Sequence, residues 1–144
     1  MSRPIIFIAS KDREFELTTF DAILDTHHGL RRAADIHDVW SVLTEETADH
    51  IAMAIIDLDF DVHGLALVNT LCSTDPDFPI LAVTSEGGET PETYHGCKTP
   101  IHHMVKPVGV SRLQEKIIDL CTRAGVMRKR KKSRSEAAAI RILA

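Results

Sequence analysis

The feature that most constrains this chain is a set of short, continuous apolar runs, each of which ends at small or polar residues. They are PIIFI at residues 4–8, IAMAII at 51–56, FPILAV at 78–83 and IHHMV at 101–105. Runs of this length without polar alternation are typical of strands buried on both faces, as in parallel sheets. An open α/β sheet covered by helices is therefore the first structure that the sequence predicts.

Helical patterns separate these runs, and a weaker run interrupted by two arginines adds a fifth strand. We predict strands at residues 4–8, 30–34, 50–57, 79–83 and 101–105, and helices at 12–28, 37–48, 64–73 and from Ser111 onward. Strands that alternate with helices form a parallel sheet through right-handed crossovers. The predicted fold is flavodoxin-like and doubly wound, with five parallel strands in the order 2-1-3-4-5 and helices on both faces.

Two of the predicted helices have recognisable ends. Gly29 is the predicted stop of the first helix, whose expected inward side is formed by Phe15, Phe20, Ile23 and Leu24. Ser111 and Gln114 have the spacing of a capping box at the start of the last helix. The expected buried stripe of that helix is Leu113, Ile117, Leu120, Cys121 and Ala124. Residues 86–100 hold almost no apolar side chains, so any helix there is predicted to be short.

Length and composition indicate one ordinary globular domain of 144 residues. No apolar stretch approaches the roughly 20 residues that cross a bilayer. The apolar run near the start is too short for a secretory signal. We therefore expect a cytoplasmic protein with no membrane partner. The three cysteines, at positions 72, 97 and 121, form no CxxC pair and suggest no disulfide framework, and Cys72 and Cys121 are expected to be buried thiols.

Charge divides the chain into two parts. Residues 1–127 carry 20 acidic and 10 basic side chains, whereas residues 128–134 (RKRKKSR) add six basic side chains. We predict a domain at residues 1–126 and a basic C-terminal extension or helix-like tail at 127–144. The tail is either a solvated extension or a segment that binds an acidic surface, a nucleic acid backbone or another domain. No helix-turn-helix or zinc pattern accompanies it, which argues against sequence-specific DNA reading.

Polar residues stand where the predicted strands end. Ala9 and Ser10 follow the first strand, Asp57 ends the third, Thr84 ends the fourth and Lys106 ends the fifth. Since ligands of open α/β sheets sit outside the carboxyl ends of the strands, these side chains are expected to converge. An aspartate, a hydroxyl and a lysine would then share one small acidic pocket.

With these residues in this order, the chain resembles the receiver domain of bacterial two-component response regulators, of the chemotaxis-receiver type, over residues 4–125. The resemblance implies that Asp57 is the phosphoacceptor and Thr84 the hydroxyl switch. Lys106, followed by Pro107, is the lysine that pairs with the added phosphoryl group. In such chemistry a carboxylate takes the phosphoryl group from a phosphohistidine, and Mg²⁺ neutralises the transferring charge.

The acidic pair that holds Mg²⁺ in the family aligns with Ala9 and Ser10, neither of which supplies a carboxylate. Asp57 remains as one metal ligand. Asp12 and Asp59 are replacement candidates, although Asp12 is also expected to begin or cap the first helix and the alternative for Asp59 is a solvated loop acid. The resemblance thus implies Mg²⁺, while the residues argue that its site is weakened.

Other readings stay open at these positions. If Asp57 is not a phosphoacceptor, it is simply an aspartate at a strand end. If Thr84 is not a switch, it is an ordinary β-branched strand residue. Lys106 is otherwise the partner of Asp57 in a simple ion pair that holds the pocket shut. His103 stands at the family's aromatic switch position, three residues before the lysine, and is otherwise a structural or surface histidine.

Three hypotheses follow. The first is a non-enzymatic receiver-like module, or pseudo-receiver, that acts by contact with a sensor kinase, with another signalling protein or with a second copy in a homodimer. The second is a working phosphoacceptor that uses Asp57, with Mg²⁺ held by Asp59 or Asp12. The third is an adaptor that binds nucleic acid or an anionic partner through residues 128–134. Small-molecule catalysis ranks lowest because no Gly-rich phosphate loop or nucleophile–base pair is present.

Overall fold

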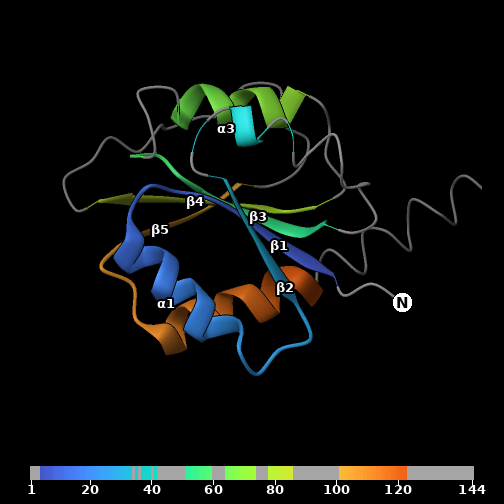
Figure 1. Ribbon diagram of the computed structural model, residues 1–144, viewed down its shortest axis with the longest axis vertical. Helices are drawn as coiled ribbons and strands as arrows, with labels where there is room; N and C mark the ends of the chain where they lie inside the picture. Colours follow the sequence, from blue (N-terminus) through green and yellow to red (C-terminus); the bar gives the residue numbers. More distant parts are fainter. Residues whose placement is uncertain are drawn as a thin grey trace, which may run out of the picture.

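The computed structural model describes residues 4–33, 35, 37–39, 41, 51–59, 64–73, 78–85 and 101–122. Its labelled elements are β1 (Ile5–Ala9), α1 (Arg13–Ile23), β2 (Gly29–Ala33), β3 (Ile51–Asp57), α3 (Gly64–Ser73), β4 (Ile80–Ser85) and β5 (Ile101–Lys106). A further helix spans residues 110–122, and residues 37–39 and 41 are helical. Figure 1 shows helices on both sides of one twisted sheet.

The sheet confirms the predicted topology. Every strand pair is parallel, and the strand order is β2-β1-β3-β4-β5. All seven residues of the central strand, β3, are buried, as expected of a strand covered on both faces. The sheet therefore has its carboxyl ends at one edge, where the predicted site residues lie.

Two hydrophobic clusters fill the spaces between the sheet and its helices. The cluster on the α3 side takes alternate strand residues such as Phe7, Ala54 and Ile56. The other takes their neighbours, such as Ile8 and Ile55, together with residues of α1 and of helix 110–122. The period-2 alternation of the strands thus supplies one core to each face, and α1 and helix 110–122 share a layer (Figure 1).

The predicted end of the first helix is wrong. α1 stops at Ile23, and Gly29 begins β2 instead of terminating the helix. The cause is local, because the backbone N–H and the hydroxyl of Thr26 both donate to the Ile23 carbonyl and turn the chain. Phe20 and Leu24 were predicted to face inward, but they are 49% and 60% exposed.

The predicted capping box is also wrong. The last helix begins at residue 110, and the Gln114 side chain donates to the Ala22 carbonyl of α1 at 3.1 Å instead of turning back to Ser111. The buried stripe is confirmed for Leu113, Ile117 and Leu120, while Cys121 is partly buried. Gln114 thus links two helices and does not close the end of its own.

Several expectations lie wholly or partly outside the described residues. They concern most of the 37–48 helix, residues 86–100, Cys97, Ala124 and the basic segment 128–134. Within the described part, the 64–73 helix is confirmed and Cys72 is buried. No helix in the described part has the length and apolar character needed to cross a membrane.

Candidate functional site

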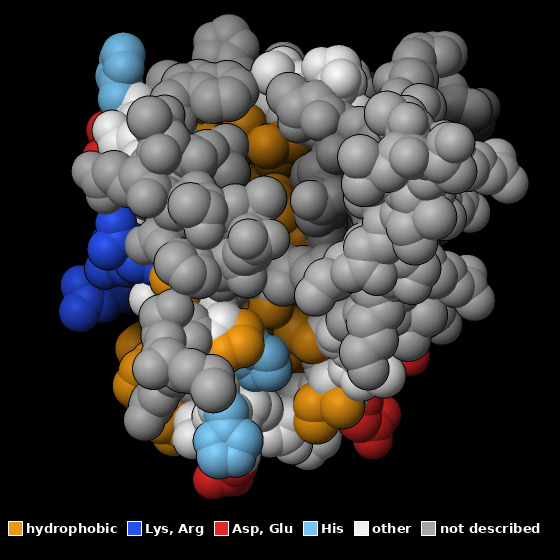
Figure 2. All heavy atoms as spheres, turned by 90° about the vertical axis from the view of Figure 1, so that its right-hand side faces the viewer, with side chains coloured by type: hydrophobic (Ala, Val, Ile, Leu, Met, Phe, Trp, Pro, Cys, Tyr) orange, Lys and Arg blue, Asp and Glu red, His pale blue; other side chains and the backbone are white. Residues whose placement is uncertain are grey.

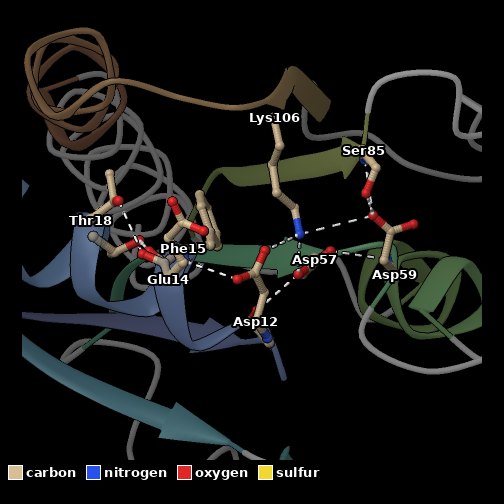
Figure 3. A network of polar contacts seen from close by, with 10 residues as sticks. Asp12, Glu14, Phe15, Thr18, Asp57, Asp59, Ser85 and Lys106 are labelled. Atoms are coloured by element: carbon tan, nitrogen blue, oxygen red, sulfur yellow. Dashed lines mark hydrogen bonds and ion pairs between the residues drawn. The ribbon is translucent and has the colours of Figure 1, made fainter.

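The carboxyl edge of the sheet brings together side chains from three segments of the chain. Asp57 and Lys106 are the last residues of β3 and β5, Ser10 follows β1, and Asp12 immediately precedes α1. Figure 3 shows the Lys106 side chain pointing into the space between Asp12, Asp57 and Asp59. Parallel strands produce this convergence, since all of their carboxyl ends lie at one edge.

Asp57 is buried, and both of its carboxylate oxygens accept hydrogen bonds. It is 1% exposed, and its Oδ2 accepts from the Ser10 hydroxyl at 2.8 Å and from Lys106 Nζ at 2.8 Å. Its Oδ1 accepts from the backbone N–H of Asp59 at 2.9 Å. A carboxylate survives burial only when charge and hydrogen bonds compensate for lost hydration, and these three donors supply that compensation.

Lys106 is the centre of an acidic cluster. Its Nζ lies 2.8 Å from Asp57 Oδ2, 3.0 Å from Asp12 Oδ2 and 3.9 Å from Asp59 Oδ2. It also lies 5.4 Å from the centre of the Phe15 ring. Partial burial alone would lower the pKa of the ammonium, but the hydrogen bonds to Asp57 and Asp12 outweigh it and raise that pKa. The lysine is therefore held in its charged form.

Asp12 has two structural tasks. Its Oδ1 accepts from the backbone N–H of Phe15 at 3.1 Å, which confirms the predicted helix cap. Its Oδ2 binds Lys106, and that hydrogen bond is the main reason why the pKa of Asp12 is lowered. The Ser10 hydroxyl accepts from the Asp12 backbone N–H at 3.0 Å while donating to Asp57, so Ser10 joins the cap to the buried carboxylate.

Asp59 is held by the end of the neighbouring strand. Its Oδ2 accepts from both the backbone N–H and the hydroxyl of Ser85, the last residue of β4. Asp59 is therefore fixed to β4, although its side chain is 42% exposed. Ser85 was not among the predicted site residues, because its only signal in the sequence is a hydroxyl directly after Thr84 at a predicted strand end.

No family model matches the sequence, and no curated protein sequence matches it. Among solved structures, a response regulator from Thermotoga maritima superposes with a TM-score of 0.67 at 14% identity, covering 84% of this chain and 99% of that one. A CheY-like response regulator receiver domain protein from Methanospirillum hungatei gives 0.67 at 18% identity, over 86% and 98%. The chain has the fold of a response-regulator receiver domain.

A longer protein contains the same fold. NtrX from Brucella abortus, in complex with ADP, superposes with a TM-score of 0.74 at 18% identity over 96% of this chain. This chain spans only 30% of the NtrX chain, so the likeness concerns one part of that protein. At these identities the likeness shows the receiver fold alone.

Ala9 and Ser10, which were predicted to stand where the family carries its acidic pair, supply no carboxylate for Mg²⁺. Ala9 is fully buried in the core, and the Ser10 hydroxyl donates its hydrogen to Asp57. The space between the three carboxylates receives the Lys106 ammonium. Among the residues that the structure describes, no group of three or more His, Cys, Asp or Glu side chains is arranged to hold a metal ion. The donor set therefore does not fit the octahedral oxygen shell of Mg²⁺.

The two predicted switch residues lie apart from this network. Thr84 is 1% exposed, and its Oγ1 has no hydrogen-bond partner in the described structure. His103 is in β5 with its side chain largely on the surface, and partial burial lowers the pKa of its ring. Within the described residues, neither side chain is hydrogen-bonded to Asp57 or Lys106, so their switch roles stay predictions.

A cavity of about 250 Å³ opens beside the network, between α1 and the end of β5. Asp12, Phe15, Ser85 and Lys106 contribute to its wall. One side of the ion-pair cluster is therefore accessible through this cavity, while Asp57 stays buried behind Lys106.

Proposed function

We propose that this chain is a receiver-like module of two-component signal transduction in which Mg²⁺-dependent phosphorylation of Asp57 is weakened or lost. One observation carries the proposal. Asp57 Oδ2, the more heavily engaged of the two possible attacking oxygens, accepts hydrogen bonds from both Ser10 and Lys106. The module then acts through protein–protein contacts, as a pseudo-receiver.

Charge explains how these contacts replace the metal. In the family, Mg²⁺ balances the acids of the pocket and the incoming phosphoryl group. Here the Lys106 ammonium lies within 4.0 Å of all three carboxylates, and Ser10 adds a neutral donor where a carboxylate would add charge. A metal ion entering this space would have to displace a lysine that is only 13% exposed. Both the nucleophile and the cation site are thus engaged before any phosphoryl donor arrives.

The proposed partners are a sensor kinase or another signalling protein, with homodimerisation as a possible mode of contact. The receiver domain is assigned to residues 1–126 and the basic extension to 127–144. No catalytic turnover is expected of the module. An adaptor role for residues 128–134 in binding nucleic acid stays a prediction, since that segment lies outside the described residues.

A second function, a working phosphoacceptor, is favoured by a different observation. Asp12, Asp57 and Asp59 all direct a carboxylate oxygen toward one point. If Lys106 moved away, these three acids would offer oxygen ligands to a metal ion. Asp12 and Asp59 would then take the place of the family's usual acidic pair. In that case Asp57 would accept a phosphoryl group with Mg²⁺ held by Asp59 or Asp12.

Intact mass after incubation with acetyl phosphate separates the two functions. The wild-type chain is treated with and without Mg²⁺, and Asp57→Asn is the matched control. We expect no Mg²⁺-dependent addition of a phosphoryl group to the wild type. An addition that requires Mg²⁺ and disappears in Asp57→Asn would overturn the pseudo-receiver proposal and support the working phosphoacceptor.

A further inference from the structure

The outward side of α1 is unusually apolar for a surface helix. Leu17, Phe20 and Leu24 are 57%, 49% and 60% exposed, whereas the helix buries Phe15, Thr19, Ala22 and Ile23 on its opposite side. Spacings of three and four residues place the exposed three in one stripe, about 10 Å long from Leu17 to Leu24. Such a stripe is typical of a helix that packs against a further segment.

Acidic side chains border this stripe. Glu14 and Asp21 lie on the adjacent side of the helix, and Asp25 follows its C-terminal end. The last turn of α1 has no basic residue, so Asp21 faces the negative end of the helix dipole. None of the three carboxylates forms an ion pair with a described residue. We call Glu14, Leu17, Phe20, Asp21, Leu24 and Asp25 the outer face of α1.

Both properties are unfavourable for an isolated surface helix, and a basic segment with apolar residues would compensate for both. A second copy of α1 would not, because Arg13 is its only basic residue and its acids would oppose one another. Figure 2, the view from the right-hand side of Figure 1, does not face α1; on that side acidic, histidine and hydrophobic side chains lie along the lower edge, and the visible Lys and Arg side chains gather on the left. Apart from Arg13, which precedes Leu17 by four residues in the same stripe, the charges on this side of α1 are acidic, and they favour a cationic occupant.

The chain itself contains such a segment. Residues 128–144 (RKRKKSRSEAAAIRILA) hold seven basic residues and one acidic residue, and they include an Ile-Arg-Ile-Leu run at 140–143. They follow helix 110–122, which lies beside α1 and is joined to it by the bond from Gln114 to the Ala22 carbonyl. The intervening residues 123–127 can extend over about 17 Å, which is far enough to reach from one helix to its neighbour.

We propose that residues 128–144 dock on the outer face of α1 of the same chain. The basic run neutralises Glu14, Asp21 and Asp25, and the terminal apolar residues cover Leu17, Phe20 and Leu24. Tethering supplies an effective concentration in the millimolar range, so that weak ionic and apolar contacts suffice. This contact goes beyond the proposed signalling function and depends on neither phosphorylation nor Mg²⁺.

Hydrogen–deuterium exchange of the α1 amides, residues 13–24, tests the contact in the full-length chain. The variant carries Asp21→Lys and Asp25→Lys. If nothing docks, the new positive charges improve the interaction with the helix dipole, and exchange of α1 becomes slower or stays unchanged. If the basic segment docks, the same charges repel it, and exchange of α1 becomes about tenfold faster. The two outcomes differ in sign.

A charge swap provides the matched control. Arg130→Glu and Lys131→Glu alone should also speed the exchange of α1, and combining them with the two lysine substitutions should restore slow exchange at least in part. Protection that persists in the Asp21→Lys, Asp25→Lys variant would overturn the proposal. Protection that rises with protein concentration would overturn it as well, because docking would then occur between copies.

Discussion

Replacing Lys106 by methionine is the most informative single change. Methionine keeps an unbranched stem beside the Phe15 ring but removes the ammonium that lies 2.8 Å from Asp57 Oδ2 and 3.0 Å from Asp12 Oδ2. The two acids respond differently because their exposure differs. Asp12 is 38% exposed and can be hydrated, whereas Asp57 is 1% exposed and cannot.

The size of the effect follows from the buried partner. Removing one member of a buried ion pair destabilises a protein by roughly 3–5 kcal/mol, since the other charge is left uncompensated. Asp57 retains the hydrogen bonds from Ser10 and from the Asp59 backbone, which places Lys106→Met near the lower end, at about 3 kcal/mol. In an Asp57→Asn background no buried charge remains, so the same substitution should cost about 1 kcal/mol.

Urea unfolding followed by circular dichroism measures these free energies as a double-mutant cycle. Lys116→Met is the matched control, because this lysine lies on helix 110–122 and has no ion pair among the described residues; its effect should stay within about 0.5 kcal/mol. A loss below about 1 kcal/mol for Lys106→Met, or an equal loss with and without Asp57→Asn, would show that Lys106 does not compensate a buried charge on Asp57.

Four further predictions concern this network and Thr84. Ser10→Ala should lower the free energy of unfolding by about 2 kcal/mol, because it removes a buried donor to Asp57, again measured in urea. Thr84→Val should leave stability unchanged or raise it by up to about 1 kcal/mol, because the buried hydroxyl has no partner in the described structure. The pKa of Asp12 is lowered from 3.8, so its contribution is present above pH 3.8 and lost as pH falls through the lower folded value; Asp12→Asn should lack that acid slope. The pKa of Lys106 is raised from 10.5, so its contribution is complete below pH 10.5 and lost as pH rises through the higher folded value; Lys106→Met should lack that alkaline slope.

Two matched controls accompany the hydroxyl variants. Ser73→Ala removes an exposed hydroxyl that binds the Thr70 carbonyl and should cost less than about 0.5 kcal/mol. Thr19→Val removes a buried hydroxyl that donates to the Phe15 carbonyl, so it should not stabilise. A loss from Thr84→Val larger than that from Thr19→Val would show that the Thr84 hydroxyl does have a partner.

The fold was predictable because its decisive signals are local. Continuous apolar runs such as residues 51–56 are buried on both faces only when helices cover both sides of the sheet. The polar residues at the carboxyl ends of these runs indicated the edge of the sheet at which the site lies. The convergence of Asp57 and Lys106 followed from the parallel topology. The cap formed by Asp12 followed from its position before a helical pattern.

The early end of α1 has a local cause in Thr26, whereas the errors at Phe20, Leu24 and Gln114 depended on contacts between distant segments. The helical pattern predicted that the apolar residues Phe20 and Leu24 face the core, but the tertiary packing of α1 leaves both exposed. Gln114 fitted a local capping pattern, yet the nearby Ala22 carbonyl offered a better partner. The link between Asp59 and Ser85 joins the loop after β3 to the end of β4, 26 residues away, and no spacing rule predicts such a link.

The proposed function requires that Lys106 and Ser10 bind the Asp57 carboxylate in place of Mg²⁺ and a phosphoryl group. The most direct test is an amide NMR titration with Mg²⁺ and beryllofluoride, which follows the signals of Asp57 and Asp59 in the wild type and in Asp57→Asn. We predict no saturable Mg²⁺-dependent shift of these signals in the wild type. A saturable shift that is abolished by Asp57→Asn would contradict the claim.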